Sequence, residues 1–174
     1  AVGLALRFEA DQVDAAALAL AGERDAARAA KDWARSAAIR DELFPLATLV
    51  TPNLDVAALL LGQSVRDVAG MERAARTMVE RFGARAALVK GGHLPGPEAV
   101  DVLFDGAVYR FRHPRIETRS THGTGCTLSS AIAAHLALGD SLGDAVEKSL
   151  DWVHEAIRSA PGLGAGNGPL NHFA

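Results

Sequence analysis

Two short apolar runs with a helical pattern between them constrain the fold of this chain more than any other feature. The runs cover residues 46–50 and 86–89, and each is closely flanked by glycine or proline. Between them, apolar residues such as Met71 and Met78 recur at helical spacing. Short buried strands that alternate with helices pair in parallel, in a sheet that helices cover. The sequence therefore predicts an α/β fold over residues 44–174.

Capping residues predict where several helices begin and end. Residues 54–61 are expected to form a short helix that ends at a glycine. Ser64 is expected to cap the next helix, which ends at Gly83. Ser141 is expected to cap a long C-terminal helix, and the glycine-rich tail 161–169 is expected to be irregular.

The dipeptide Asp105-Gly106 predicts a β-hairpin that adds antiparallel strands to the sheet. It separates two runs rich in apolar and aromatic residues, 100–104 and 107–111. We interpret Asp101 and Asp105 as exposed charges on this hairpin.

Composition indicates a soluble protein with an ordinary hydrophobic core. Of the 174 residues, 49% are hydrophobic, and the net charge of −3 gives no reason to expect nucleic acid or an anionic membrane as a partner. The chain has a single cysteine, and no apolar run approaches the length of a membrane span. We therefore expect a cytoplasmic protein without membrane association.

Residues 8–43 are alanine-rich and charged, unlike the sequence that follows them. Their apolar spacing predicts a helix from about Glu23 to Leu43, preceded by a shorter helix. Arg24 and Lys31 belong to a basic stripe in which acidic residues are interleaved. This alternation favours a solvated helix face, and an RNA-binding module that uses the stripe is the alternative.

A glycine-rich loop, Gly123-Thr124-Gly125-Cys126, opens directly into a run of small residues with helical character. Glycines let backbone amides approach a ligand closely, and a helix N-terminus attracts anions, usually phosphate. Cys126 is expected in the first helical turn, where the same field favours a thiolate. We hypothesise that the loop holds a phosphoryl group in transfer and that Cys126 faces the attacking hydroxyl. A structural turn and an inert buried thiol are the alternatives.

Further polar and glycine residues follow the two predicted strands. Asn53 comes after the first strand, and Lys90, Gly91 and Gly92 come after the second. Ligands bind at the carboxyl ends of parallel strands, so we expect these residues to meet the glycine-rich loop and its phosphoryl ligand. Lys90 suits phosphate contact as a compact positive charge, and a plain surface lysine is the alternative.

In this order, the motifs resemble those of the phosphomethylpyrimidine kinase family of thiamine biosynthesis, within the ribokinase superfamily. The resemblance covers residues 44–174 and is carried by the segments 46–53, 89–93, 118–127 and 166–173. It implies a ribokinase-like three-layer sandwich of which only the C-terminal half is present. It also implies ATP-dependent phosphorylation, with Mg²⁺, of hydroxymethylpyrimidine and then of its monophosphate.

The resemblance implies roles for the site residues as well. Cys126 would assist deprotonation of the substrate hydroxyl or phosphate, and Lys90 would neutralise phosphate charge. The amides of Gly123, Thr124 and Gly125 would form the anion hole. No residue of this chain is assigned as a metal ligand.

The chain departs from the family pattern in two places. Val56 stands where the family usually has a glutamate that helps organise Mg²⁺ and phosphate, and Asp55 is the nearest carboxylate. Residues 1–43 stand in the place of the family's N-terminal half. Within them, residues 21–36 and 39–43 resemble the C-terminal helical region of cysteinyl-tRNA synthetases.

The sequence therefore indicates two joined pieces, a helical segment 1–43 and a partial ribokinase-like domain 44–174. A non-catalytic fusion or chimera that keeps a relic phosphate-binding loop is the alternative to an active kinase. Because half of a doubly wound sheet exposes a strand edge, we also expect a homodimer, with a small pyrimidine as the substrate.

Overall fold

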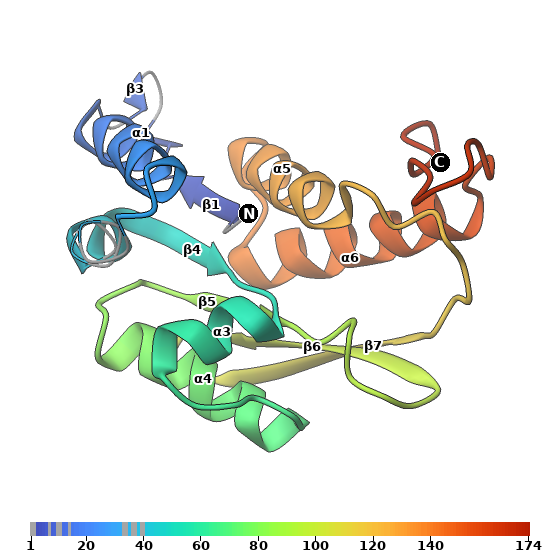
Figure 1. The fold of residues 1–174 in the computed structure, drawn as a ribbon, viewed down its shortest axis with the longest axis horizontal. Coiled ribbons are helices and arrows are strands. Elements are labelled where there is room, and N and C mark those ends of the chain that lie inside the picture. The colour runs from blue at the N-terminus through green and yellow to red at the C-terminus, as the bar shows by residue number, and fades with distance from the viewer. Residues whose placement is uncertain are drawn as a thin grey trace.

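The computed structural model describes residues 3–6, 8–9, 12–13, 15–32, 35, 38 and 41–174. Within these residues, a five-stranded sheet separates two pairs of helices (Figure 1). Its strands, in spatial order, are β1 (Gly3–Leu6), β4 (Ala47–Thr51), β5 (Ala87–Lys90), β6 (Glu98–Phe104) and β7 (Val108–Pro114). Two further short strands, β2 (Phe8–Glu9) and β3 (Gln12–Val13), pair with each other. The three-layer α/β architecture confirms the predicted fold class.

The two pairs of helices build two separate cores. Helices α3 (Leu54–Leu61) and α4 (Val68–Glu80) cover one face of the sheet, and α5 (Thr124–Ala137) and α6 (Leu142–Arg158) cover the other (Figure 1). Alternation along β5 sends Val89 toward Met78 of α4 and Leu88 toward Ile132 of α5. All four side chains are fully buried. Among the described helices, none is both long and apolar enough to cross a bilayer.

Strand pairing shows the predicted mixture of directions. β4 and β5 run parallel, with Val50 opposite Ala87, whereas β5, β6 and β7 pair antiparallel. The hairpin strands are longer than predicted, because pairing continues as far as Glu98 opposite Pro114. No prediction covered β1, which pairs antiparallel with β4 at the edge of the sheet.

Helix ends follow the predicted caps in part. Ser141 caps α6 as predicted, by accepting from the N–H of Asp144 at 3.2 Å, whereas α4 ends at Glu80, before the predicted Gly83. Asn53 caps α3, for which no N-cap was predicted. The prediction that Ser64 caps α4 is wrong, because the side chain of Asp67 accepts from the N–H of Gly70 at 2.6 Å instead. Val65, between the two candidate caps, is buried in the core, and α4 begins after it, at Val68.

The N-terminal segment differs most from its prediction. Helix α1 (Ala15–Ala29) ends in a turn, and Lys31 has a φ of 59°. Asp32 then accepts from the N–H of Arg35 at 2.9 Å, as an N-cap does. The prediction of a continuous helix from Glu23 to Leu43 is therefore wrong. The shorter helix predicted before it is present in part, because α1 begins at Ala15 and the strands β2 and β3 precede it. A 3₁₀ turn, η1 (Phe44–Leu46), leads into β4.

The basic stripe of this segment is paired with acidic neighbours. The guanidinium of Arg24 contacts the carboxylate of Asp25 at 2.8 Å, and that of Arg35 contacts Glu23 at 2.6 Å. The Arg35–Glu23 pair is about half exposed, as expected for the solvated helix face that the charge alternation favours, whereas only 13% of the Arg24 side chain is exposed. Trp33 and Ala37, which supported the long predicted helix, lie outside the described residues.

Candidate active site

The carboxyl ends of β4 and β5 lie side by side. The backbone N–H of Lys90 donates to the carbonyl of Pro52 at 2.9 Å, and Asn53 and Lys90 form a parallel bridge. Asn53 also begins α3, because its side chain accepts from the N–H of Val56 at 2.8 Å. The two strand ends therefore meet, as the sequence predicts.

The side chain of Lys90 reaches from β5 to the first turn of α5. A Cβ atom on Gly125 would lie 2.8 Å from Lys90 Nζ, so the ammonium occupies the space that a side chain would need. Burial lowers the pKa of Lys90 from its ordinary 10.5, while Asp101 and Cys126 act in the opposite direction. Lys90 and the glycine-rich loop thus form one positively charged site.

The glycine-rich loop begins α5 without a capping side chain. Gly123 has a φ of 82°, a left-handed conformation that favours glycine. The hydroxyl of Thr124 donates to the carbonyl of Thr121 at 2.8 Å and closes the turn. The amides of Gly125 and Cys126 belong to the first helical turn, where N–H groups have no acceptor within the helix. Together with the helix dipole, these amides favour an anion at this point.

A polar contact between β4 and α5 fixes this loop to the sheet. Thr51 Oγ1 and Ser129 Oγ lie 3.0 Å apart, and Ser129 Oγ donates to the carbonyl of Gly125 at 3.0 Å. The proton between the two hydroxyls therefore comes from Thr51, which is fully buried. The strand end and the backbone of the loop are thereby held in one hydrogen-bonded chain.

Asp101 belongs to the site, although the sequence-based prediction for it is wrong. Only 8% of its surface is exposed, and its Oδ1 accepts from the N–H of Gly91 at 3.0 Å. Burial raises the pKa of Asp101 above 3.8, while the Gly91 amide, His113 and Lys90 favour the charged form. Asp101 lies in β6, which pairs with β5 on one side and β7 on the other, and it stands opposite Lys90. Asp101 and Leu103 are two residues apart in the predicted strand and so share a face of the sheet, which could have indicated from the sequence that Asp101 is buried.

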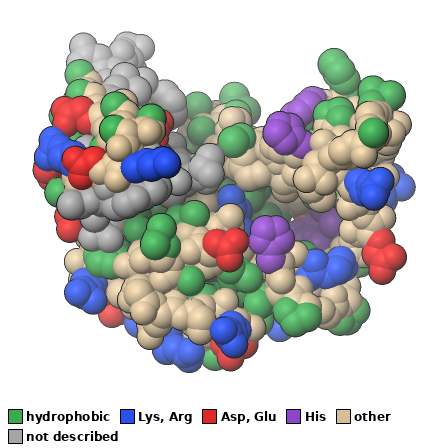
Figure 2. All heavy atoms as spheres, viewed as in Figure 1, with side chains coloured by type: hydrophobic (Ala, Val, Ile, Leu, Met, Phe, Trp, Pro, Cys, Tyr) green, Lys and Arg blue, Asp and Glu red, His purple; other side chains and the backbone are tan. Residues whose placement is uncertain are grey.

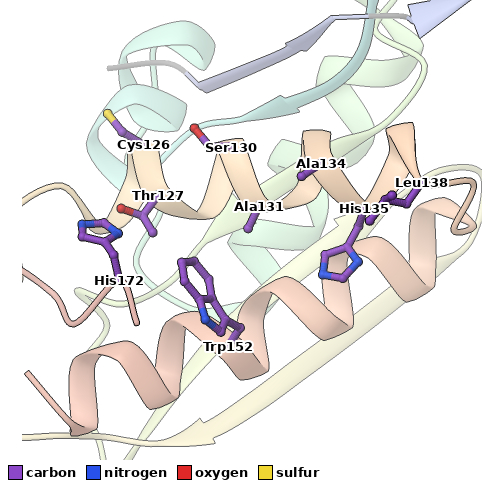
Figure 3. Close-up of a pocket in the computed structure, with 9 residues that line it drawn as sticks. All are labelled: Cys126, Thr127, Ser130, Ala131, Ala134, His135, Leu138, Trp152 and His172. Atoms are coloured by element: carbon purple, nitrogen blue, oxygen red, sulfur yellow. The ribbon is translucent and has the colours of Figure 1, made fainter. Parts of the chain in front are cut away.

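A groove of about 630 Å³ runs along α5 beside the glycine-rich loop (Figure 3). It is lined by Cys126, Thr127, Ser130, Ala131, Ala134, His135, Leu138, Trp152 and His172. Cys126 and Ser130 project from the side of α5 away from Trp152 (Figure 3). Cys126 is exposed, so the alternative of an inert buried thiol is wrong. On the same side of the molecule, basic and histidine side chains lie in the hollow between α5 and α3 (Figure 2).

Comparison with known proteins assigns this site to a family. The sequence model of phosphomethylpyrimidine kinase matches residues 22–171. The chain belongs to the phosphomethylpyrimidine kinase family. It is 52% identical over 141 residues to the hydroxymethylpyrimidine/phosphomethylpyrimidine kinase of Rhizobium meliloti, across 79% of this chain and 53% of that protein. It is 50% identical over 136 residues to the thiamine biosynthesis bifunctional protein ThiED of Geobacter sulfurreducens, across 78% of this chain and 28% of that protein.

Solved structures agree with the family assignment. The Bacillus subtilis pyridoxal kinase, determined as an ADP complex, is 36% identical with a TM-score of 0.75, across 80% of this chain and 55% of that one. This similarity confirms the ribokinase-like fold. The chain spans about half the length of the Rhizobium kinase. The family match begins at residue 22, inside the segment that composition sets apart, and a division near residue 43 stays a prediction.

The predicted residues of this phosphomethylpyrimidine kinase family member fall into two groups. Asn53, Lys90, Gly91 and Gly125 meet where the strand ends approach α5. Gly92 lies farther out, where it is exposed and its carbonyl accepts from Arg115 Nη1 at 2.7 Å. Its observed contact is therefore with the segment after β7.

The carboxylates of the site do not assemble a metal centre. In the part of the chain that the structure describes, no group of three or more His, Cys, Asp or Glu side chains is placed to hold a metal ion. Asp55 is exposed in the first turn of α3, and Asp101 is engaged by Gly91. These residues do not fit a protein-built Mg²⁺ site, so no step is derived through one.

Proposed function

We propose that this chain carries the phosphoryl-transfer part of a hydroxymethylpyrimidine and phosphomethylpyrimidine kinase, with ATP as the donor. The proposal rests on the closeness of Lys90 to the loop: a Cβ atom added to Gly125 would lie 2.8 Å from Lys90 Nζ. An ammonium and the positive end of a helix repel each other unless an anion lies between them. The family assignment and the ADP complex of the similar pyridoxal kinase support a nucleotide phosphate as that anion.

In the first proposed reaction, the hydroxymethyl oxygen loses its proton and takes the γ-phosphoryl group of ATP, and ADP leaves. In the second, a phosphate oxygen of the monophosphate takes the γ-phosphoryl group of another ATP, and ADP leaves again. Lys90 and the amides of Gly125 and Cys126 stabilise charge on the transferred group. Gly123 and Thr124 shape the loop that presents these amides. Cys126 assists removal of the proton from the attacking oxygen.

The turns after β4 and β5 are assigned to the nucleotide side of the site. Asn53 and Gly91 lie in these turns beside Lys90, and Gly92 follows farther out. Mg²⁺ enters this proposal as the partner of ATP, where it would neutralise phosphate charge.

Calorimetric titration with Mg-ATP tests the phosphate site. In Gly125→Ala the new methyl group displaces Lys90 Nζ, and we expect affinity to fall about tenfold or more, as for loss of a charged hydrogen bond. Gly143→Ala in α6 is the matched control, because a Cβ there meets nothing within 4 Å. Equal affinities in the two variants would contradict the proposal.

Turnover is tested by assaying phosphorylation of hydroxymethylpyrimidine. The chain is assayed alone and mixed with the N-terminal half of the Rhizobium meliloti kinase. Phosphorylated product in either assay supports the kinase. Nucleotide binding without product in both assays favours a non-catalytic fusion that keeps a relic phosphate loop.

The proposal also covers the localisation, the oligomeric state and the domain division of the chain. We infer a cytoplasmic homodimer and a helical segment 1–43 related to cysteinyl-tRNA synthetases, joined to the kinase domain 44–174. Sedimentation equilibrium tests the homodimer, and a monomer at micromolar concentration would refute it. Thermal unfolding tests the division, since two separate domains are expected to unfold in two steps and a single unit in one.

A further inference from the structure

Asp101 and Lys90 lie side by side on one face of the sheet. They are directly opposite each other in the antiparallel pairing of β5 and β6. Leu88 and Leu103, two positions away on each strand, both pack with the helices α5 and α6. Because alternate residues share a face, the carboxylate and the ammonium both point toward the α5 side, beneath the glycine-rich loop.

Asp101 has two kinds of contact at this position. Its Oδ1 accepts from the N–H of Gly91 at 3.0 Å, and it interacts electrostatically with Lys90 and His113. His113 in turn contacts the carboxylate of Asp151 at 2.8 Å and stacks on His154, with ring centroids 5.0 Å apart. The titratable side chains that interact with the pair are thus His113 of β7, which Asp151 and His154 of α6 contact in turn, and Cys126 of α5.

The hydrogen bond to Gly91 does not require a charge. An asparagine oxygen accepts from an N–H as an aspartate oxygen does. Burying a carboxylate, in contrast, is unfavourable for folding. The fold therefore does not explain why this buried position carries an ionisable carboxyl, and we look for its role at the site.

The neighbouring Lys90 explains why a carboxyl group is present at this position. Its ammonium is partly buried and points at the positive end of α5, and both circumstances disfavour the charged form. We propose that Asp101 is the positioning residue that keeps Lys90 protonated and directed at the first turn of α5. The inference deepens the proposed kinase function and rests on it, because a charged Lys90 matters there for binding phosphate.

Titration of the lysine amines by NMR tests the proposal without any ligand. The chain has three lysines, Lys31, Lys90 and Lys148, so labelled side chains are readily resolved. In Asp101→Asn we expect the acid dissociation constant of Lys90 to rise about tenfold or more, with Lys31 unchanged. An unchanged Lys90 would overturn the inference.

The matched control is Asp105→Asn, the same substitution at the exposed end of the hairpin. Asp105 accepts from the N–H of Ala107 at 3.2 Å, so an asparagine there also keeps its hydrogen bond. The control should leave the titration of Lys90 as in the wild type. If Asp101→Asn does not fold, the titration of the wild type tests the proposal instead. The NMR signal of Lys90 should then shift a second time at acidic pH, as Asp101 titrates. Absence of this second shift would overturn the proposal.

Mg-ATP binding as a function of pH separates this inference from the kinase proposal. In Asp101→Asn we expect affinity for Mg-ATP to weaken at a lower pH than in the wild type, because Lys90 then loses its proton at a lower pH. Identical pH profiles would overturn the role of Asp101. No binding by the wild type at any pH would instead refute the proposed function, while the lysine titration would still decide on Asp101.

Discussion

The two faces of the sheet are filled in different ways. The core under α3 and α4 consists of apolar side chains, with Met71, Ala75 and Met78 fully buried. The core under α5 and α6 begins in the same manner, with Leu88 and Ile132. At the end near the glycine-rich loop, however, this second face buries polar and charged groups.

The two faces therefore differ in their effect on stability: the apolar residues stabilise the fold, whereas the buried polar and charged residues reduce its stability. Thr51 and Asp101 are buried on the α5 side, next to the partly buried Lys90. Buried polar groups contribute less to stability than apolar packing does, and buried charges usually reduce it. Their concentration at one end of one face marks the site more clearly than any single motif does.

Gly91→Ala should give the largest effect, because it disturbs both faces. A Cβ at Gly91 would lie 2.0 Å from the carbonyl oxygen of Val100 and 2.8 Å from Met71 Cε. We expect the variant to lose about 4 kcal/mol or more of unfolding free energy, measured in urea. A loss as small as that of an exposed substitution would show that β5 and β6 can separate.

Met78→Ala should break the apolar face alone. Met78 is fully buried, so we expect a loss of about 2–5 kcal/mol in unfolding free energy. The affinity of the folded protein for Mg-ATP should stay that of the wild type. A stable variant with lost affinity would contradict the separation of the two faces.

Asp101→Asn should change how the stability of the folded protein depends on pH, because it removes a buried carboxyl from the polar face. Because the pKa of Asp101 is raised above 3.8, this carboxyl stabilises the folded state below pH 3.8, and the contribution is lost as pH rises through the folded-state pKa. Asparagine does not titrate, so the variant should gain stability relative to the wild type as pH rises. Urea unfolding at about pH 3.5 and pH 7 measures the difference, and a constant difference would contradict the burial of this charge.

Arg110→Ala should have the smallest effect. Arg110 Nε contacts Glu72 Oε1 at 2.6 Å, but the pair is solvent-exposed. Exposed ion pairs contribute little to stability, so we expect a thermal midpoint close to that of the wild type. A large decrease would show that β7 and α4 depend on this surface contact.

Local signals predicted the elements that depend on neighbouring residues. Ser141 caps α6, and Asp105-Gly106 turns the hairpin. The meeting of Lys90 with Gly125 also followed, since strand ends and a helix N-terminus converge in a parallel α/β array. The Gly-rich loop, its exposed cysteine and the strand-end lysine are thus predictable parts of the site.

Long-range packing decided the rest. Asp101 is buried because β6 lies between β5 and β7, and the turn signal at Asp105 does not reveal that β6 also pairs with β5. Asp67 replaces Ser64 as a cap because Val65 must reach the core first. Strand β1 depends on residues far along the chain, which no local pattern reports.

Strand β1 also changes how the sheet meets other molecules. By pairing along β4, it occupies backbone groups that would otherwise accept an added strand. At the opposite edge of the described sheet, β7 carries Arg110 and Arg112, each paired with a carboxylate. Charged side chains along an edge oppose pairing with a further chain. On the β4 side, the free edge of the described sheet is therefore the short strand β1, whereas the charged β7 edge opposes the addition of a further strand.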